Sequence, residues 1–126
     1  QACLPRLREA SDSAVVFTLD DPSRTSQAFW GGYGVAQGAQ EALVPMLHAE
    51  LANTPVRVSA LRLRPLRTPL RARAYVERED PDAIAPAAYA AACVHLLSPA
   101  GASRRGTIWA PAVDAEPLVP LPQAGA

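Results

Sequence analysis

The chain has 126 residues, 49% of them hydrophobic and 19% charged, which is enough for one domain with a modest core and too few for two. Twelve basic residues balance twelve acidic ones, so no overall electrostatic field directs the protein to nucleic acid or to an anionic membrane. All twelve basic residues are arginine, and this excludes every mechanism that needs a lysine amine of this sequence as a Schiff base, proton donor or phosphate ligand.

The two cysteines and the hydropathy pattern narrow the class of protein further. Cys3 and Cys93 stand far apart, without a second pair or a histidine-rich neighbourhood, so neither a disulfide framework nor a metal site is predicted. No apolar run approaches the roughly 20 residues of a membrane span, and the first residues lack the order of a signal peptide. These features favour a soluble, cytoplasmic protein with reduced thiols and no membrane partner.

The first part of the chain predicts a strand followed by a long helix. The first ten residues, with Leu4 and Leu7 spaced for one face, are typical of the end of a helix. The β-branched and aromatic run Ser13–Leu19 predicts a buried strand, and the Asp-Asp-Pro sequence after it predicts a turn or loop. Apolar residues four positions apart then predict a helix from about Phe29 to Asn53. Pro45 lies inside this helix and should bend it, at a cost of about 3 kcal/mol.

A second strand and a second helix follow in the same order. Val56–Leu63 predicts a strand, and the arginine-rich stretch Pro65–Arg78 predicts a loop with a short helix. Asp82 is expected to cap an alanine-rich helix over Ile84–Leu97, which a Ser-Pro pair ends.

The last segments complete the predicted fold. Thr107–Val113 predicts a final strand, although Pro111 requires it to lie at an edge or to end early. The proline-rich tail Pro117–Ala126 is expected to be extended or flexible, so the domain spans residues 1–116. Strands alternating with helices predict an α/β fold, a partial Rossmann-like parallel sheet of about three strands with flanking helices. Because parallel sheets normally have more members, we expect an exposed edge that pairs with another strand or subunit.

Five segments occur in an order and spacing that belong to a known family. They are the strand Val15–Thr18, the stretch Trp30–Val35 that opens the long helix, Pro55–Val58 at the next strand, Arg67–Arg71 after it, and Leu96–Pro99 at the end of the last helix. As an ordered set they resemble the C-terminal half of a classical short-chain dehydrogenase/reductase and cover almost the whole chain. The resemblance implies a doubly wound fold and NAD(P)-dependent oxidoreductase chemistry.

The resemblance implies a catalytic site around Tyr33 in which two of three signature positions are changed. The family has a serine after the strand, a tyrosine thirteen positions later and a lysine four positions beyond it. Tyr33 matches the tyrosine, whereas Asp20 stands at the serine position and Gln37 at the lysine position. Tyrosine titrates near pH 10, and in the family the positive charge of the lysine stabilises the phenolate. The neutral amide of Gln37 does not provide this charge, and the negative charge of Asp20 would destabilise the phenolate. We therefore expect the isolated chain to be inactive.

The resemblance also implies a cofactor site that this chain supplies only in part. Thr68 stands where the family often has a threonine for the nicotinamide carboxamide, and Arg62 and Arg64 stand at the family's Asn-Pro-Gly segment. These two arginines are the candidates for the missing positive charge, and together with the other arginines from position 57 to 73 they are the expected phosphate contacts if a cofactor binds. The family's glycine-rich turn and catalytic asparagine belong to its front half, which this sequence does not contain. We expect no cofactor on the isolated chain, and NAD(P) only where the other half is supplied.

Two further patterns have simpler interpretations. Gly32, Gly34 and Gly38 spell GxGxxxG, but they do not follow a strand in a tight turn, so close packing at a helix start explains them better than a dinucleotide site. Six arginines lie between Arg57 and Arg73 with no acid among them, a pattern that could contact a phosphate or an RNA backbone. Few aromatic residues are interleaved with them, which favours a solvated loop and no nucleic-acid partner.

Two functional hypotheses remain. In the first, the chain is a catalytically degenerate half-domain that acts in assembly or regulation, using its open sheet edge and the helix that carries Tyr33 to bind itself or a full-length relative. In the second, it is part of an NAD(P)-dependent short-chain oxidoreductase whose cofactor-binding front half is missing from this chain. The sequence does not identify a small-molecule substrate.

Overall fold

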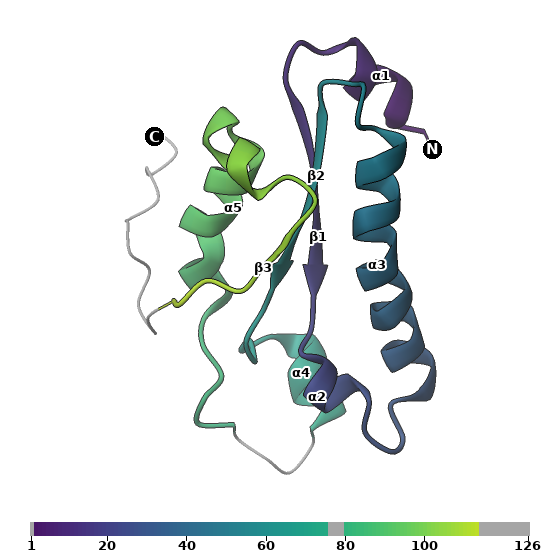
Figure 1. Ribbon diagram of the computed structural model, residues 1–126. Coiled ribbons are helices and arrows are strands. Elements are labelled where there is room, and N and C mark those ends of the chain that lie inside the picture. Colours follow the sequence, from purple (N-terminus) through teal and green to yellow (C-terminus); the bar gives the residue numbers. More distant parts are fainter. Residues whose placement is uncertain (1, 76–79, 114–126) are drawn as a thin grey trace.

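A parallel sheet of three strands forms the centre of the computed structural model, which describes residues 2–75 and 80–113 (Figure 1). The strands are β1 (Ser13–Leu19), β2 (Val56–Arg62) and β3 (Ile108–Trp109), in the order β1-β2-β3. Both pairings are parallel, with Ser13 opposite Val56 and Ala60 opposite Ile108. The predicted α/β fold with a three-stranded parallel sheet is confirmed.

The side chains of the sheet alternate between two helical layers. Val56, Val58 and Ala60 of β2 are fully buried in one core together with Val44 of the long helix. Leu61 belongs to a second core, formed mainly by residues from 84 to 96. β2 is therefore buried on both faces, as the central strand of a parallel sheet must be.

The long helix α3 (Gly31–Glu50) covers one face of the sheet, as Figure 1 shows. It begins at Gly31 because Phe29 has a φ of 73°, outside the right-handed helical region, and it ends before the predicted Asn53. The helix continues through Pro45, whose neighbour Val44 has no exposed surface. Packing of α3 on the sheet holds the helical backbone across the position where the proline removes one hydrogen bond.

The opposite face is covered by α5 (Ala90–Leu97), which follows the short 3-10 helix η1 (Pro86–Tyr89). The predicted helix over residues 84–97 is correct only in its second half, and its expected cap at Asp82 is wrong. Ile84 instead pairs with Leu66 in an isolated parallel bridge, in which its N–H donates to the Pro65 carbonyl. A proline at position 86 pushes the preceding residue into extended backbone, which prevents an earlier helical start.

Four short elements accompany the sheet and its two covering helices. The predicted N-terminal helix is α1 (Leu4–Glu9), and the short helix expected in the arginine-rich stretch is α4 (Pro69–Ala74). A further short helix, α2 (Pro22–Thr25), was not predicted, and η2 (Pro99–Arg104) leads from α5 to β3.

The final strand is shorter than predicted, because β3 ends at Trp109, two residues before Pro111. The boundary at 116 and the tail 117–126 lie outside the described residues. Within residues 2–75 and 80–113, no helix combines the length and the apolar character needed to cross a bilayer.

Candidate functional site

A cavity of about 340 Å³ opens at the carboxyl ends of β1 and β2. In open α/β sheets, ligands bind outside this end of the strands. Its walls come from the end of β1, the start of α3, the segment after β2, and α4. The lining residues are Thr18, Leu19, Asp20, Trp30, Tyr33, Gln37, Leu63, Arg64, Pro65, Leu66, Thr68, Leu70, Arg71, Ala74 and Tyr75.

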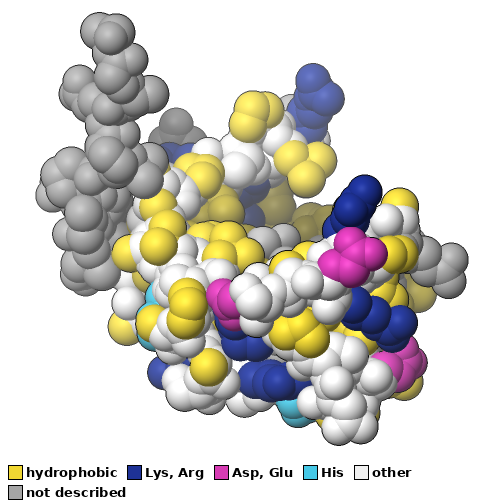
Figure 2. Space-filling model, turned by 90° about the horizontal axis from the view of Figure 1, so that it is seen from above, with side chains coloured by type: hydrophobic (Ala, Val, Ile, Leu, Met, Phe, Trp, Pro, Cys, Tyr) yellow, Lys and Arg dark blue, Asp and Glu magenta, His cyan; other side chains and the backbone are white. Residues whose placement is uncertain are grey.

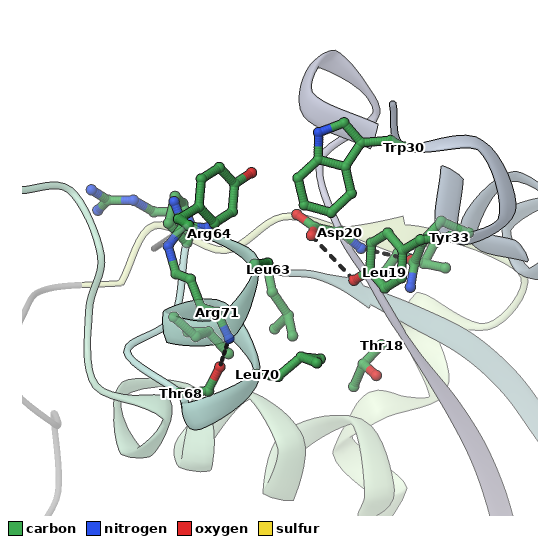
Figure 3. A pocket seen from close by; sticks show the side chains of 15 residues that line it. Thr18, Leu19, Asp20, Trp30, Tyr33, Leu63, Arg64, Thr68, Leu70 and Arg71 are labelled. Carbon is green, nitrogen blue, oxygen red and sulfur yellow. Dashed lines mark hydrogen bonds between the residues drawn. The ribbon is translucent and has the colours of Figure 1, made fainter. Parts of the chain in front are cut away.

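Asp20 and Tyr33, which the sequence places thirteen positions apart, meet on one side of this cavity (Figure 3). The Tyr33 hydroxyl donates to Oδ2 of Asp20 over 3.3 Å. The other carboxylate oxygen, Oδ1, accepts from the Arg24 guanidinium and, over 2.7 Å, from the backbone N–H of Asp21. Asp20 is therefore anchored at the end of β1, and it bonds directly to the phenol.

Gln37 completes this group one helical turn beyond Tyr33. Its Oε1 accepts from the backbone N–H of Asp20 over 2.9 Å, which ties α3 to the end of β1. Burial raises the pKa of Tyr33 above its usual value of 10.0, and the charge of Asp20 and the hydrogen bond to it raise the pKa further, against a smaller opposing effect of Arg24. The phenol is accordingly held in its protonated form at neutral pH.

Two of the three candidate cofactor residues, Thr68 and Arg64, line the cavity, and the third, Arg62, does not. Thr68 and Arg64 line the cavity together with Tyr33. Thr68 is also the cap of α4, because its Oγ1 accepts from the backbone N–H of Arg71 over 3.2 Å. The backbone N–H of Arg64 donates to the Tyr89 hydroxyl over 2.8 Å, which fixes the chain where it leaves β2.

Arg62 lies outside the group of residues that line the Tyr33 cavity. Its guanidinium donates to Glu41 of α3 over 2.9 Å and to the backbone carbonyl of Asp20 over 3.3 Å. Arg62 thus joins α3 to the ends of β1 and β2, and its charge is already matched by a carboxylate.

Three other arginines of the basic stretch, Arg57, Arg67 and Arg71, also make contacts within the chain. Arg57 pairs with Asp12 and donates to the carbonyls of Leu97 and Ser98 at the end of α5. Figure 2 shows basic and acidic side chains side by side on the face seen there, as expected for a chain without net charge. Within the described residues, Arg57, Arg62 and Arg71 of this stretch each pair with a carboxylate.

An aromatic wall, which was not predicted from the sequence, borders the cavity. The Trp30 ring lies 5.5 Å from the Tyr33 ring and 5.5 Å from the Tyr75 ring, measured between centroids. The Arg71 guanidinium lies 4.4 Å over the Tyr75 ring and also pairs with Asp80. No pattern in the sequence links Trp30 and Tyr75, because the residue before α3 and the residue after α4 meet only in the folded chain.

The glycines of the GxGxxxG pattern do not form a phosphate cradle. A Cβ on Gly34 would overlap the backbone carbonyl of Thr25, so this glycine allows α2 and α3 to pack closely. Gly32 and Gly38 face open space. The charge of Arg62, an expected phosphate contact, is already neutralised by Glu41. Without a glycine cradle and with this arginine engaged, the residues that the structure describes do not fit a whole dinucleotide. Nor do they contain a cluster of three or more metal-binding side chains of the His, Cys, Asp or Glu type.

Solved structures of other proteins share the fold of this chain. No family model and no curated protein matches the sequence. A short chain dehydrogenase of Salmonella enterica serovar Typhi matches in structure with a TM-score of 0.78 and 26% identity, over 87% of this chain and 45% of its own. A protein of Pseudomonas syringae assigned to the short chain dehydrogenases matches with a TM-score of 0.78 and 31% identity, over 86% of this chain and 44% of its own.

A third similar structure carries a cofactor. It is a protein of Escherichia coli, also assigned to the short chain dehydrogenases and solved with NADPH, with a TM-score of 0.77 and 25% identity over 87% of this chain and 45% of its own. The chain spans less than half the length of each of these three structures. Its fold is therefore that of part of a short-chain dehydrogenase.

Proposed function

We propose that this chain is a catalytically degenerate, C-terminal half of a short-chain dehydrogenase-like domain that acts by association, with a second copy of itself or with a full-length relative. The observation that carries this proposal is the hydrogen bond from Tyr33 to Asp20, with Gln37 in place of an amine one turn further along α3. We also place the protein in the cytoplasm, in keeping with its free cysteines Cys3 and Cys93.

The site chemistry opposes proton transfer by Tyr33. A phenol works as a general acid or base near neutral pH only if its pKa is lowered toward the working pH. Here burial and the carboxylate of Asp20 both raise that pKa. Gln37 contributes a neutral amide, and its oxygen is already engaged by the backbone of Asp20. The site therefore favours binding over turnover.

The outer surface of α3 supports the association. Val35 is 74% exposed and Met46 is 57% exposed, although apolar side chains of this size are normally covered. The exposed positions between them are small or apolar, and Glu41, the acidic residue within this stretch, is engaged by Arg62. A helix face without charged side chains suits packing against a second helix.

The free edge of β1 also supports the proposed association. Among the described residues, β1 pairs only with β2, so its other edge carries backbone groups without a strand partner. Four successive residues from Ala14 to Phe17 are only partly buried, in contrast to the buried β2. This edge therefore offers backbone groups with which an additional strand can pair.

Turnover and association are tested separately on the purified chain. We expect no carbonyl reduction with NADH or NADPH and no cofactor binding at millimolar concentration. Sedimentation velocity is expected to show a dimer, or a complex when a full-length relative is added. Reduction of a carbonyl compound by the chain alone, abolished in Tyr33→Phe, would overturn the proposed degeneracy. A monomer at every concentration, with no complex, would overturn the proposed association.

A second candidate function is supported by the position of the cavity. Tyr33, Arg64 and Thr68 line one space at the carboxyl ends of the strands, where a short-chain oxidoreductase would bring nicotinamide and substrate together. In this alternative the chain is half of an active NAD(P)-dependent enzyme. The front half of a relative, expressed separately and added to this chain, should then restore NADPH-dependent reduction that Tyr33→Phe abolishes.

A further inference from the structure

The ring of Phe29 is turned away from the rest of the chain. Phe29 lies on the turn between α2 and α3, and it is fully exposed (106%). Its φ of 73° lies in the left-handed region, which large side chains rarely occupy because the Cβ comes too close to the following carbonyl oxygen. A strained turn that holds an aromatic ring in water points to a contact outside this chain.

The Tyr33 cavity has walls and a size that suit a phenyl ring. Trp30 and Tyr75 form its aromatic wall, and Leu63 and Leu70 also line it. Aromatic rings pack favourably against such a wall in tilted or offset geometry. An apolar cavity of about 150 Å³ is large enough to hold a benzene molecule. The Tyr33 cavity, at about 340 Å³, therefore accommodates a phenylalanine side chain.

The exposed ring and the cavity are neighbours on the surface. Phe29 directly precedes Trp30, whose ring lines the cavity, but Phe29 itself is not among the lining residues. A two-fold axis beside this point lets the ring of each copy reach the cavity of the other, so that the contact closes after two copies. The same contact between remote surfaces would instead continue into an open chain of molecules.

The charges beside the ring and the cavity are complementary. Asp21 begins the segment that leads to Phe29, and a hydrogen bond of 2.9 Å from the backbone N–H of Ser23 lowers the pKa of its carboxyl. Arg64 lines the cavity. Among residues 2–75 and 80–113, neither Asp21 nor Arg64 forms a salt bridge. Both border one hollow of about 400 Å³, so a two-fold axis near it brings Asp21 of each copy toward Arg64 of the other.

From this combination we propose that two copies of this chain bind each other by reciprocal insertion of Phe29 into the cavity of the other copy, with the ring against Trp30 and Tyr75. A few aromatic side chains inserted into pockets carry most of the binding energy of many interfaces. This inference names one contact within the proposed self-association and rests on it. The contact does not use Val35 or Met46 of α3, which are not among the residues of the cavity.

Phe29→Asn separates this contact from the stability of the chain. Asparagine adopts left-handed backbone more readily than phenylalanine and has no ring to insert. We expect the dissociation constant for self-association to rise about 100-fold, or about ten-fold for each of two lost rings, whereas the melting temperature of the monomer stays the same or rises. Sedimentation velocity and circular dichroism measure the two quantities.

Val94→Asn is the control, because it removes another exposed apolar side chain from a different helix, α5. We expect it to dimerise as the unmodified chain does. An unchanged dissociation constant in Phe29→Asn, or an equal rise in Val94→Asn, overturns the Phe29 contact and leaves the proposed association standing. A monomer of the unmodified chain at every concentration overturns both.

Mixing two variants tests whether the insertion is reciprocal. Ala74 lines the cavity, so Ala74→Phe places a ring of the same chain there and should weaken self-association as Phe29→Asn does. A mixture of the two variants still allows one insertion, because the first supplies Phe29 and the second supplies an unmodified cavity. We expect this heterodimer to form about ten-fold more tightly than either homodimer. A heterodimer no tighter than the homodimers overturns reciprocal insertion.

Photo-cross-linking locates the ring directly and requires no change in the cavity, so it decides the question if Ala74→Phe does not fold. The full chain carries p-benzoylphenylalanine at position 29, and a mixture of isotopically labelled and unlabelled chains distinguishes adducts between copies by mass. We expect adducts with Leu63, Leu70 or Tyr75 of the other copy. Adducts only within one chain, or only with residues away from the cavity, overturn the proposal.

Discussion

At the scale of single residues, the pKa of the Tyr33 phenol lies above that of a free tyrosine. Its hydroxyl donates to Asp20, and burial together with this carboxylate raises its pKa. The folded chain therefore holds the phenolic proton more tightly than the unfolded chain, whose tyrosines titrate near pH 10. The stability that comes from this difference is fully present below about pH 10 and is lost as the pH rises through the folded pKa.

This difference in pKa between the folded and the unfolded chain predicts that Tyr33 makes the free energy of unfolding fall at alkaline pH. Between about pH 9 and about pH 11.5, the free energy of unfolding of the unmodified chain should fall more steeply than that of Tyr33→Phe, which has no proton to lose at this site. Urea unfolding at a series of pH values measures both slopes. Tyr89→Phe serves as the control, since its hydroxyl accepts from a backbone N–H and does not contact Asp20. Parallel slopes for the unmodified chain and Tyr33→Phe would contradict the predicted linkage.

The core of this site could be predicted from the sequence because its members lie within one strand-to-helix connection. The resemblance to the short-chain dehydrogenases, whose signature positions are spaced by thirteen and four residues, implies that Asp20, Tyr33 and Gln37 lie together. The structure shows hydrogen bonds from Tyr33 to Asp20 and from the Asp20 backbone to Gln37. Trp30 and Tyr75 could not be joined in the same way. Their contact depends on how the segment after β2 folds back, which no local periodicity encodes.

At the scale of elements, a close contact joins α2 to the first turn of α3. Gly34 lies in the first turn of α3, and its missing side chain lets the helix approach the Thr25 carbonyl at the end of α2. Because α2 follows Asp20 and Asp21 directly, this contact also fixes the distance between the end of β1 and Tyr33. The close approach is therefore part of what forms the cavity.

Replacing this glycine should damage both stability and the site. We expect Gly34→Ala to destabilise the chain by about 1–3 kcal/mol, because a new methyl group would overlap backbone that cannot move aside easily. Gly38→Ala is the matched control on the same helix, where nothing lies near the new methyl group, and it should stabilise by up to about 1 kcal/mol through helix propensity. Chemical denaturation measures both changes. Equal effects of the two substitutions would show that the approach to α2 is unimportant.

The elements themselves were predictable to different degrees, for physical reasons. β1 and the long helix were predicted well because an unbroken apolar run and a stripe of four-residue period determine them. The start of α5 was misplaced because helix propensity favours the alanines, whereas Pro86 and the bridge of Ile84 to Leu66 impose extended backbone first. α2 was overlooked although Asp21 followed by Pro22 is a recognised helix start.

At the scale of the whole molecule, both helical layers leave apolar side chains exposed: Val35, Leu43 and Met46 on α3, and Val94 and Leu97 on α5. α3 is 20 residues long and carries an uncharged outer surface from Val35 to Met46 apart from the paired Glu41, whereas α5 is 8 residues long. The sheet also ends at β1 without a further strand among the described residues. Within the described residues, the first feature leaves apolar side chains exposed and the second leaves a strand edge without a partner strand. A surface of this kind is costly to leave in water and so favours a partner.

A charged residue placed on this surface should separate association from folding. We expect Met46→Glu to weaken self-association about ten-fold or more while leaving the melting temperature of the monomer nearly unchanged, because Met46 is 57% exposed and its replacement loses few contacts within the chain. Val94→Glu is the matched control on α5, where the valine is 63% exposed but belongs to the opposite layer. Sedimentation velocity over a range of concentrations gives the dissociation constants, and circular dichroism follows the melting. A dimer weakened equally by both substitutions would locate the contact elsewhere, and one weakened only by Val94→Glu would assign it to the α5 layer.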